Sequence, residues 1–173
     1  MNALARLGGP FGLWGIGGVL TILSYAVVRL WPMAVEALSG DLGPIEWVGL
    51  AGSVAILWYY EGVRAFQRAF SPRVIARAGT LSGGAPLLRK VFAPFFCMGL
   101  IYATRRRLII SWVTVSGVAL LVVGVRMLPQ PWRGIVDAGV IVALGWGCLT
   151  LIAFALGAAQ GRPSKVPTDL PPA

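Results

Sequence analysis

The chain has 173 residues, of which 57% are hydrophobic and only 12% are charged, and its mean hydropathy is +0.79. These values exclude an ordinary soluble domain and indicate an integral membrane protein. The formal net charge of +9 does not indicate nucleic-acid binding, because the basic residues flank apolar runs and most aromatic residues lie within them. Anionic phospholipid is therefore the expected partner of the basic residues.

An uncharged run from Leu7 to Val28 predicts the first membrane-spanning helix, over residues 11–30. The run exceeds the roughly 18 residues that identify a spanning helix. A cleaved signal peptide is the competing interpretation, but its apolar region is usually only about 7–15 residues long. We therefore predict a helix that is retained in the protein.

The second predicted span, residues 44–63, depends on its flanks. The charge-free stretch from Trp47 to Tyr60 is too short to cross a membrane alone. Extending it to 44–63 gives a helix of about 30 Å, with Glu46 and Glu61 near opposite headgroup regions. Pro44 suits the first turn of such a helix.

Two further uncharged runs predict spans over residues 108–126 and 138–159. The first lies between Arg107 and Arg126, and the second follows Asp137. The predicted fold is thus an all-α, four-transmembrane-helix bundle that forms one domain over residues 1–162. The Pro-rich tail, residues 163–173, has little apolar content to bury and is predicted to be disordered.

Charge predicts the orientation of this bundle. Nine basic residues and no acidic one lie between Arg64 and Arg107, whereas the other two connections contain few basic residues. Because Lys and Arg are retained on the cytoplasmic side, loop 64–107 and both termini are predicted to be cytoplasmic. The excess of Arg over Lys, together with the absence of a cleavable presequence, favours a bacterial inner membrane.

The central cytoplasmic loop is predicted to contain two interfacial helices. Ser71 and Pro72 form a helix-start signal and Gly79 a stop, so a short helix near 72–78 would place Arg73 and Arg77 near lipid phosphates. Residues 91–104 are too few to span and too apolar to lie in water. A surface-lying helix is favoured there, and a re-entrant segment is the alternative.

Seven basic residues of this loop are candidate ligands for anionic lipid or a partner protein. Three of them begin the third span, where the helix dipole disfavours cations by about 0.3–1 kcal/mol. An anionic leaflet offsets this at about 1 kcal/mol for each basic residue. The favoured interpretation of the cluster of Arg105, Arg106 and Arg107 is nevertheless a retention signal without a specific ligand, and a specific site for lipid or a partner is the alternative. The candidates are Arg73, Arg77, Arg89, Lys90, Arg105, Arg106 and Arg107.

Acidic residues near the predicted spans are interpreted first as structural. Glu61 is predicted to pair with Arg64, and Arg126 with Asp137 across the turn between the last two spans. The functional alternative is a proton-accepting or cation-binding Glu61 beside Tyr59 and Tyr60. The many glycines are expected to serve close helix packing.

The sequence offers no catalytic group, metal site or cofactor site. It has no histidine, which excludes histidine-ligated haem and His-dependent zinc sites. It also lacks a P-loop and clustered aspartates. Cys97 and Cys148 have no CxxC spacing and are interpreted as small packing residues.

The leading hypothesis is a non-catalytic accessory or assembly subunit whose basic cytoplasmic loop docks anionic lipid or a partner complex. A small oligomeric transporter or channel is the alternative, with Glu61 or the Arg126 and Asp137 pair near a pore. A lipid-modifying enzyme using Tyr59, Tyr60 and Glu61 is the third possibility.

Overall fold

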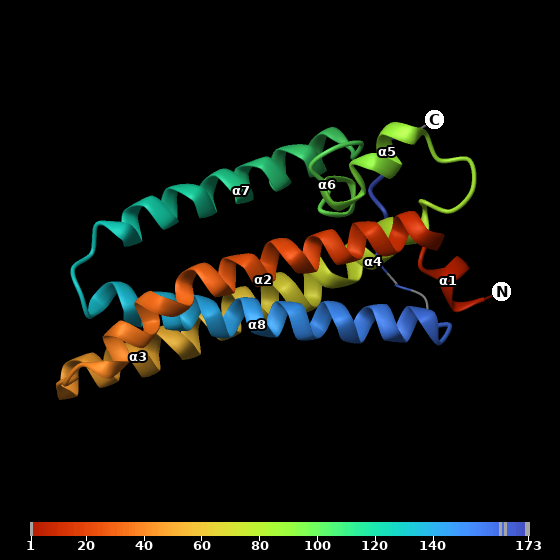
Figure 1. Cartoon of the computed structure of the whole chain (residues 1–173). Helices are drawn as coiled ribbons and strands as arrows, with labels where there is room; N and C mark the ends of the chain where they lie inside the picture. Colours follow the sequence, from red (N-terminus) through yellow and green to blue (C-terminus); the bar gives the residue numbers. More distant parts are fainter. Residues whose placement is uncertain (1, 163, 165, 172–173) are drawn as a thin grey trace.

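A computed structural model of the chain describes residues 2–162, 164 and 166–171, and this part is helical without any strand (Figure 1). Three of its helices are long and apolar enough to cross a membrane: α2 (Gly9–Ser39), α7 (Arg105–Arg126) and α8 (Trp132–Ala159). The prediction of an all-helical protein is confirmed for the described residues. These three helices contain three of the four predicted spans and indicate a membrane protein.

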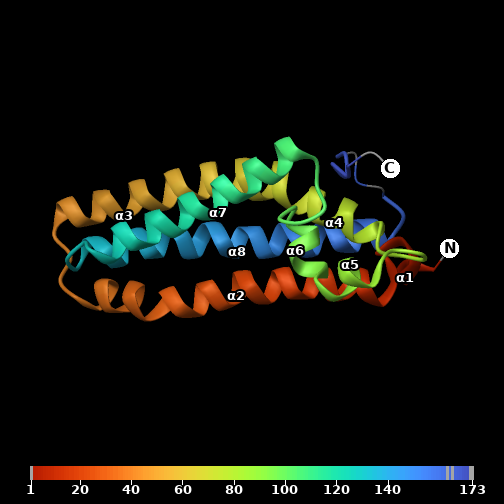
Figure 2. The same cartoon turned by 90° about the horizontal axis from the view of Figure 1, so that it is seen from above.

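Helix α8 lies at the centre of the bundle, with α2 along one side (Figure 2). Along its other side runs a continuous helical rod made of α3 (Pro44–Leu57), η1 (Trp58–Phe70) and α4 (Ser71–Gly79). Glycines of α8 allow close approach on both sides: Gly134 faces α2, Gly139 faces α3, and Gly147 faces the Phe66 ring of η1.

The predicted second span, residues 44–63, covers α3 and the first part of η1. Helix α3 has 14 residues and η1 has 13, so neither is long enough by itself to cross a membrane. The segment η1 is wound as a π-helix, which closes its hydrogen bonds at i→i+5 and makes a wider turn.

Helix α2 is longer than the predicted span 11–30, because it continues through Pro32 to Ser39. Good helix formers follow the proline, and two of them, Ala34 and Ala37, are buried. Ala37 lies against Gly134 of α8, so packing stabilises this extension. Only residues 40–43 connect α2 with α3.

The predicted helix near 72–78 exists as α4, but it lies inside the bundle and not on its surface. Val74, Ile75 and Ala78 are buried in a cluster with Val19 of α2 and Leu151 of α8. The predicted interfacial position of this helix is therefore wrong for its apolar side chains, which face protein and not the membrane. These side chains find a protein core because α2 and α8 both reach this end of the molecule.

The predicted helix over 91–104 is replaced by shorter pieces. Helix α5 (Leu87–Val91) precedes α6 (Ala93–Cys97), and an irregular segment follows to Thr104. Gly99 has a φ of 77°, a backbone conformation that stops the helix and reverses the chain. The side of α6 carrying Ala93, Pro94 and Cys97 packs on Gly15 and Gly18 of α2.

The described residues of the tail that is predicted to be disordered, 164 and 166–171, form no helix but contact the rest of the chain. The Ser164 hydroxyl donates a hydrogen bond of 2.8 Å to the Pro72 carbonyl, and the Thr104 N–H donates one of 2.9 Å to the Asp169 carbonyl. Leu170 packs against the buried cluster. Contacts with distant parts of the chain thus hold a segment that composition assigned to disorder. The prediction for 163, 165, 172 and 173 lies outside the described residues.

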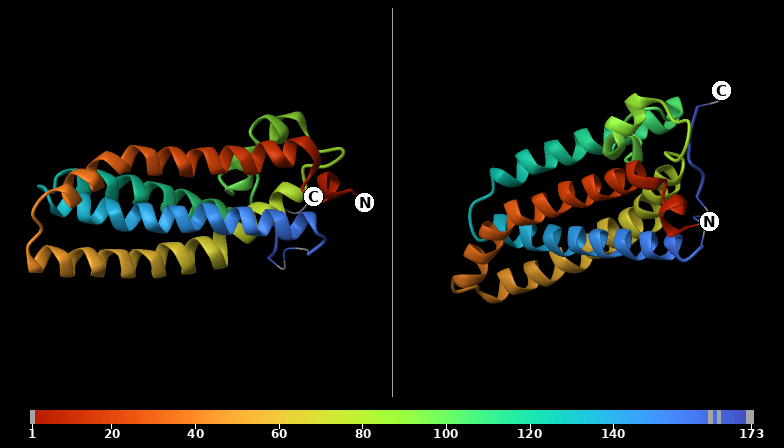
Figure 3. Two further views of the ribbon diagram at one scale, coloured as in Figure 1. Left: turned by 60° about the horizontal axis from the view of Figure 1, so that its bottom comes forward. Right: turned by 45° about the vertical axis from the view of Figure 1, so that its right-hand side comes forward.

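Helix α7 stands apart from the rest of the bundle, and Ser111 is its only buried residue (Figure 3). Its first turns adjoin the segment after α6, where Trp112 donates a 3.2 Å hydrogen bond to the Leu100 carbonyl, whereas its far end reaches α8 through a short turn. The first turns of α7, helices α1 (Ala3–Arg6), α4, α5 and α6, and the end of α8 gather at one end of the molecule, hereafter the basic end.

Candidate functional site

Arg77 lies at the centre of the basic end and is fully buried. Its Nε donates a 2.6 Å hydrogen bond to the Phe96 carbonyl, and its Nη1 donates one of 2.7 Å to Thr168. Its Nη2 donates 2.9 Å hydrogen bonds to Ile101 and Tyr102. The guanidinium thus joins α4 to α6, to the segment before α7 and to the C-terminal tail.

This environment removes Arg77 from the candidate lipid ligands, which corrects the prediction. The guanidinium also lies 4.2 Å from the centroid of the Phe96 ring. Burial lowers the pKa of Arg77 to about 10, which still leaves the side chain charged at neutral pH. Carbonyl dipoles and an aromatic face therefore stabilise the cation where a lipid phosphate was expected.

Cys97 is buried close to Arg77. Burial raises the pKa of the Cys97 thiol to about 12, although the nearby guanidinium acts in the opposite direction. A thiol with this pKa is almost entirely protonated at neutral pH and is a poor nucleophile. Its sulfur packs against Gly15, in agreement with its interpretation as a packing residue.

Arg73 and Arg107 form a second group of charges beside Arg77. The Nε of Arg73 lies 3.1 Å from the Asp169 carboxylate, and both side chains are largely buried. Arg107 is near enough to experience both of these charges. Two cations thus share one acidic partner, which leaves this group with a net positive charge.

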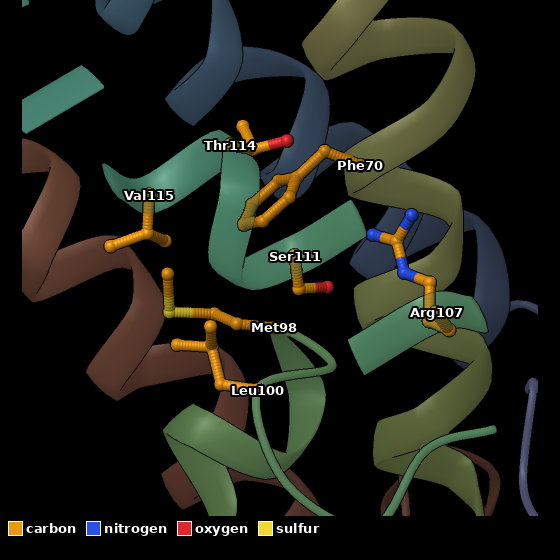
Figure 4. A pocket seen from close by; sticks show the side chains of 7 residues that line it. All are labelled: Phe70, Met98, Leu100, Arg107, Ser111, Thr114 and Val115. Atoms are coloured by element: carbon orange, nitrogen blue, oxygen red, sulfur yellow. The ribbon is translucent and has the colours of Figure 1, made fainter. Parts of the chain in front are cut away.

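A cleft opens between the start of α7, the end of η1 and the segment after α6 (Figure 4). Its volume is about 70 Å³, room for roughly two water molecules. Four of its lining residues are apolar: Phe70, Met98, Leu100 and Val115. The other three are Arg107, Ser111 and Thr114, so the cleft joins an apolar wall to a polar one.

The other four candidate basic residues have different environments. Arg89 lies over the Tyr102 ring at 4.4 Å, and Lys90 lies over the Phe11 ring at 5.1 Å. Arg105 and Arg106 are exposed. The seven candidates therefore divide into one buried anchor, two cations over aromatic rings, two cations near Asp169 and two exposed arginines.

Neither predicted ion pair is found among the described residues. Asp137 lies 3.8 Å from Arg133 and not from Arg126 at ion-pair distance, because α8 begins at Trp132 and places Arg133 four residues before the carboxylate on one helix face. Arg64 lies 5.6 Å from the Tyr60 ring centroid, and Glu61 is exposed. In the wider turn of η1 the residue four positions back, not three, faces Arg64.

Sequence reasoning missed Ser111 and Asp169. Ser111 is one of three hydroxyl residues in an apolar run, with Thr114 and Ser116, and this is an available signal, since a polar side chain in a spanning helix usually faces protein. Asp169 gave no such signal, because it lies in a tail without periodicity.

The fold and this site define the class of the protein: a helical membrane protein with a cationic, carbonyl-stabilised end. Within the described residues, no group of three or more Cys, Asp or Glu side chains is placed to hold a metal ion. Comparison with known protein families, curated proteins and solved structures finds no match for the chain.

Proposed function

We propose that this protein is a four-span subunit of a bacterial inner membrane, with residues 44–63 as the second span. Support comes from how the rod of α3, η1 and α4 packs along α8. Trp146 donates a 3.0 Å hydrogen bond to Gln67, and the Ser71 and Thr150 hydroxyls lie 3.1 Å apart. Such interhelical hydrogen bonds are typical of membrane bundles. Ile45 and Val48, both 73% exposed, would face lipid.

The cytoplasmic position of both termini is supported by the distribution of charge between the two ends. Arg6 donates a 3.2 Å hydrogen bond to the Ala159 carbonyl, so the chain's first helix and the end of α8 meet. The basic residues of loop 64–107 lie at that same end (Figure 3). The opposite end contains Glu36, Asp41 and Glu46. Retention of cations in the cytoplasm then orients the bundle.

The function that the geometry supports best is non-catalytic docking. The protein is an accessory or assembly subunit whose basic end holds anionic phospholipid and meets a partner complex at the inner leaflet. The observation that carries this proposal is the pair of exposed arginines, Arg105 and Arg106, at the beginning of an apolar helix that the bundle hardly covers. Cations at this helix end need an external anion.

Purification in mild detergent tests the proposal. Replacing Arg105, Arg106 and Arg107 by Gln is expected to lower both co-purified acidic phospholipid and any captured membrane complex by about tenfold or more. The control replaces Arg29 and Arg126, outside the basic end, by Gln. Unchanged lipid and unchanged partners in the triple variant would contradict docking at the basic end.

A further inference from the structure

The cleft beside α7 contains two buried polar atoms that have no hydrogen-bond partner among the residues that the structure describes. Ser111 is only 5% exposed, and its hydroxyl has no hydrogen-bond partner in the described part of the chain. The Nε of Arg107 is likewise buried and unpaired. Thr114 in the same cleft differs, because its hydroxyl donates a 2.8 Å hydrogen bond to Ile110. Unpaired buried donors cost about 1–3 kcal/mol each, so a ligand that accepts from both would be stabilised.

The two unpaired atoms converge on one point. A methyl group placed on Gly99 would lie 3.3 Å from the Arg107 Nε and 3.3 Å from the Ser111 hydroxyl. Because Gly99 has no side chain, the space between these two atoms stays open. Figure 4 shows the Ser111 hydroxyl beside the Arg107 side chain, so an acceptor group placed here would meet both donors.

Charge in the surroundings favours an anion. Arg107 is influenced by Arg73, by the single acidic residue Asp169 and by its own helix, whose first turn begins with Arg105 and Arg106. The start of a 22-residue helix also presents unpaired N–H groups and a positive dipole end. The cleft therefore has cationic donors and an incomplete supply of negative charge.

The apolar wall of the cleft indicates that the ligand also has an apolar part. Phe70, Met98 and Leu100 face Val115 across the cleft. The same face of α7 continues through Val118 and Val122, which are 51% and 39% exposed. An apolar track thus leads away from the polar atoms along the helix, as an acyl chain would need.

We propose that this cleft binds one acidic glycerophospholipid. Its phosphate accepts hydrogen bonds from Arg107 and Ser111, and one acyl chain lies against Phe70, Met98 and Val115 before it continues along α7. This inference rests on the proposed function in one respect, namely that the basic end faces an anionic leaflet. It adds a defined site, in place of a diffuse attraction, and names the lipid class.

Native mass spectrometry of the full chain in mild detergent, titrated with phosphatidylglycerol, tests the site. Replacing Arg107 by Gln is expected to weaken binding of the first lipid by about tenfold or more, and Ser111→Ala by about tenfold. Ser111→Ala removes an unpaired buried hydroxyl, so the thermal unfolding midpoint should not fall. The matched control is Arg126→Gln, which removes the same charge from an exposed position at the other end of α7 and should retain the first lipid.

Two comparison ligands test whether the site selects an acidic phospholipid. Phosphatidylcholine with the same acyl chains should bind at least tenfold more weakly, and inorganic phosphate should not displace the lipid at equal concentration. Displacement by phosphate at that concentration would show a small-anion site and overturn the proposal. Equal losses in Arg106→Gln and Arg107→Gln, with none in Ser111→Ala, would also overturn it while leaving docking by the basic end intact. Absence of phosphatidylglycerol binding by the unchanged protein would overturn both the lipid site and the proposed docking function.

Discussion

Helices α7 and α8 have similar lengths and almost equal apolar character, yet they have opposite roles in the fold. In the most apolar stretch of each helix, 28% of α8 is buried within the protein but only 6% of α7. Helix α8 contacts α2, α3, η1 and α4, whereas α7 is held at its two ends. Apolar character therefore marks both as candidate spans but does not distinguish the centre of the bundle from its periphery.

The glycines of the two helices have different surroundings. Gly134, Gly139 and Gly147 of α8 each lie directly against another helix. Gly117 and Gly124 of α7 face open space, with no protein atom near the position of an added methyl group. Since packing and not apolarity drives helix association in a membrane, small residues at contacts determine which helix becomes central.

The largest expected effect comes from filling a contact glycine. Replacing Gly134 by Leu should prevent a stable bundle, because even its first side-chain carbon would collide with the Met33 carbonyl and the Ala37 side chain. Gly117→Leu in α7 is the matched change and should leave stability within about 0.5 kcal/mol. Thermal unfolding in detergent measures both. Equal destabilisation by the two variants would contradict the assignment of α8 as the central helix.

A smaller loss is expected when α7 loses its attachment to the bundle. Arg77→Met should cost about 3–5 kcal/mol, because carbonyls of Phe96, Ile101 and Tyr102 would lose a charged donor inside the protein. Arg77→Lys should recover only part of the lost stability, since an ammonium group lacks the planar fork that reaches several carbonyls.

Hydrogen exchange or limited proteolysis should locate the damage of Arg77→Met at residues 96–104 and the start of α7, and not in α8. Arg106→Met is the control, because this arginine is exposed and should be nearly neutral. Loosening of α8 before α7 would show that Arg77 supports the whole bundle equally.

The smallest effect concerns reactivity and leaves the fold intact. Because the Cys97 pKa is raised to about 12 and its thiol is buried, maleimide at pH 8 should not modify it in the folded protein. A cysteine introduced at exposed Ser82 should react within minutes under the same conditions, and in intact cells only after the membrane is permeabilised.

The sign of the pH effect follows from this shift. The unfolded thiol ionises near pH 9, so the contribution of Cys97 to stability is present below that pH and decreases as the pH rises toward 12. Cys97→Ala should therefore unfold with a weaker pH dependence between 9 and 12. Rapid labelling of native Cys97 would show that α6 opens readily.

Much of the helical architecture was predictable, whereas the site was not. Uncharged runs such as 108–126 and 138–159 located helices, because a membrane requires about 20 apolar residues in sequence. Helix length beyond the apolar run depends on tertiary packing, and for this reason the continuation of α2 to Ser39 was missed. The cleft brings Phe70, Met98 and Ser111 together from three segments, a proximity that has no local pattern in the sequence.

The same limit applies to the candidate ligands. Sequence position grouped Arg77 with Arg73 and Arg106, since all are cations in one loop. Their burial differs completely, because α4 enters the core with Arg77 on its inner face, while Arg106 remains on the outer surface of α7. Charge patterning thus predicted which end of the molecule is basic but not which cation is free to bind.

The hydrogen bond from Arg77 to Thr168 has a consequence for biosynthesis. Its two residues are separated by 91 positions, so at about 5–20 residues per second the ribosome makes the acceptor roughly 5–20 s after the donor. During that interval the guanidinium lacks one of its carbonyls, while the spans that follow it are still being inserted. The contacts of Arg77 at the basic end are therefore completed only after Thr168 of the tail has been made.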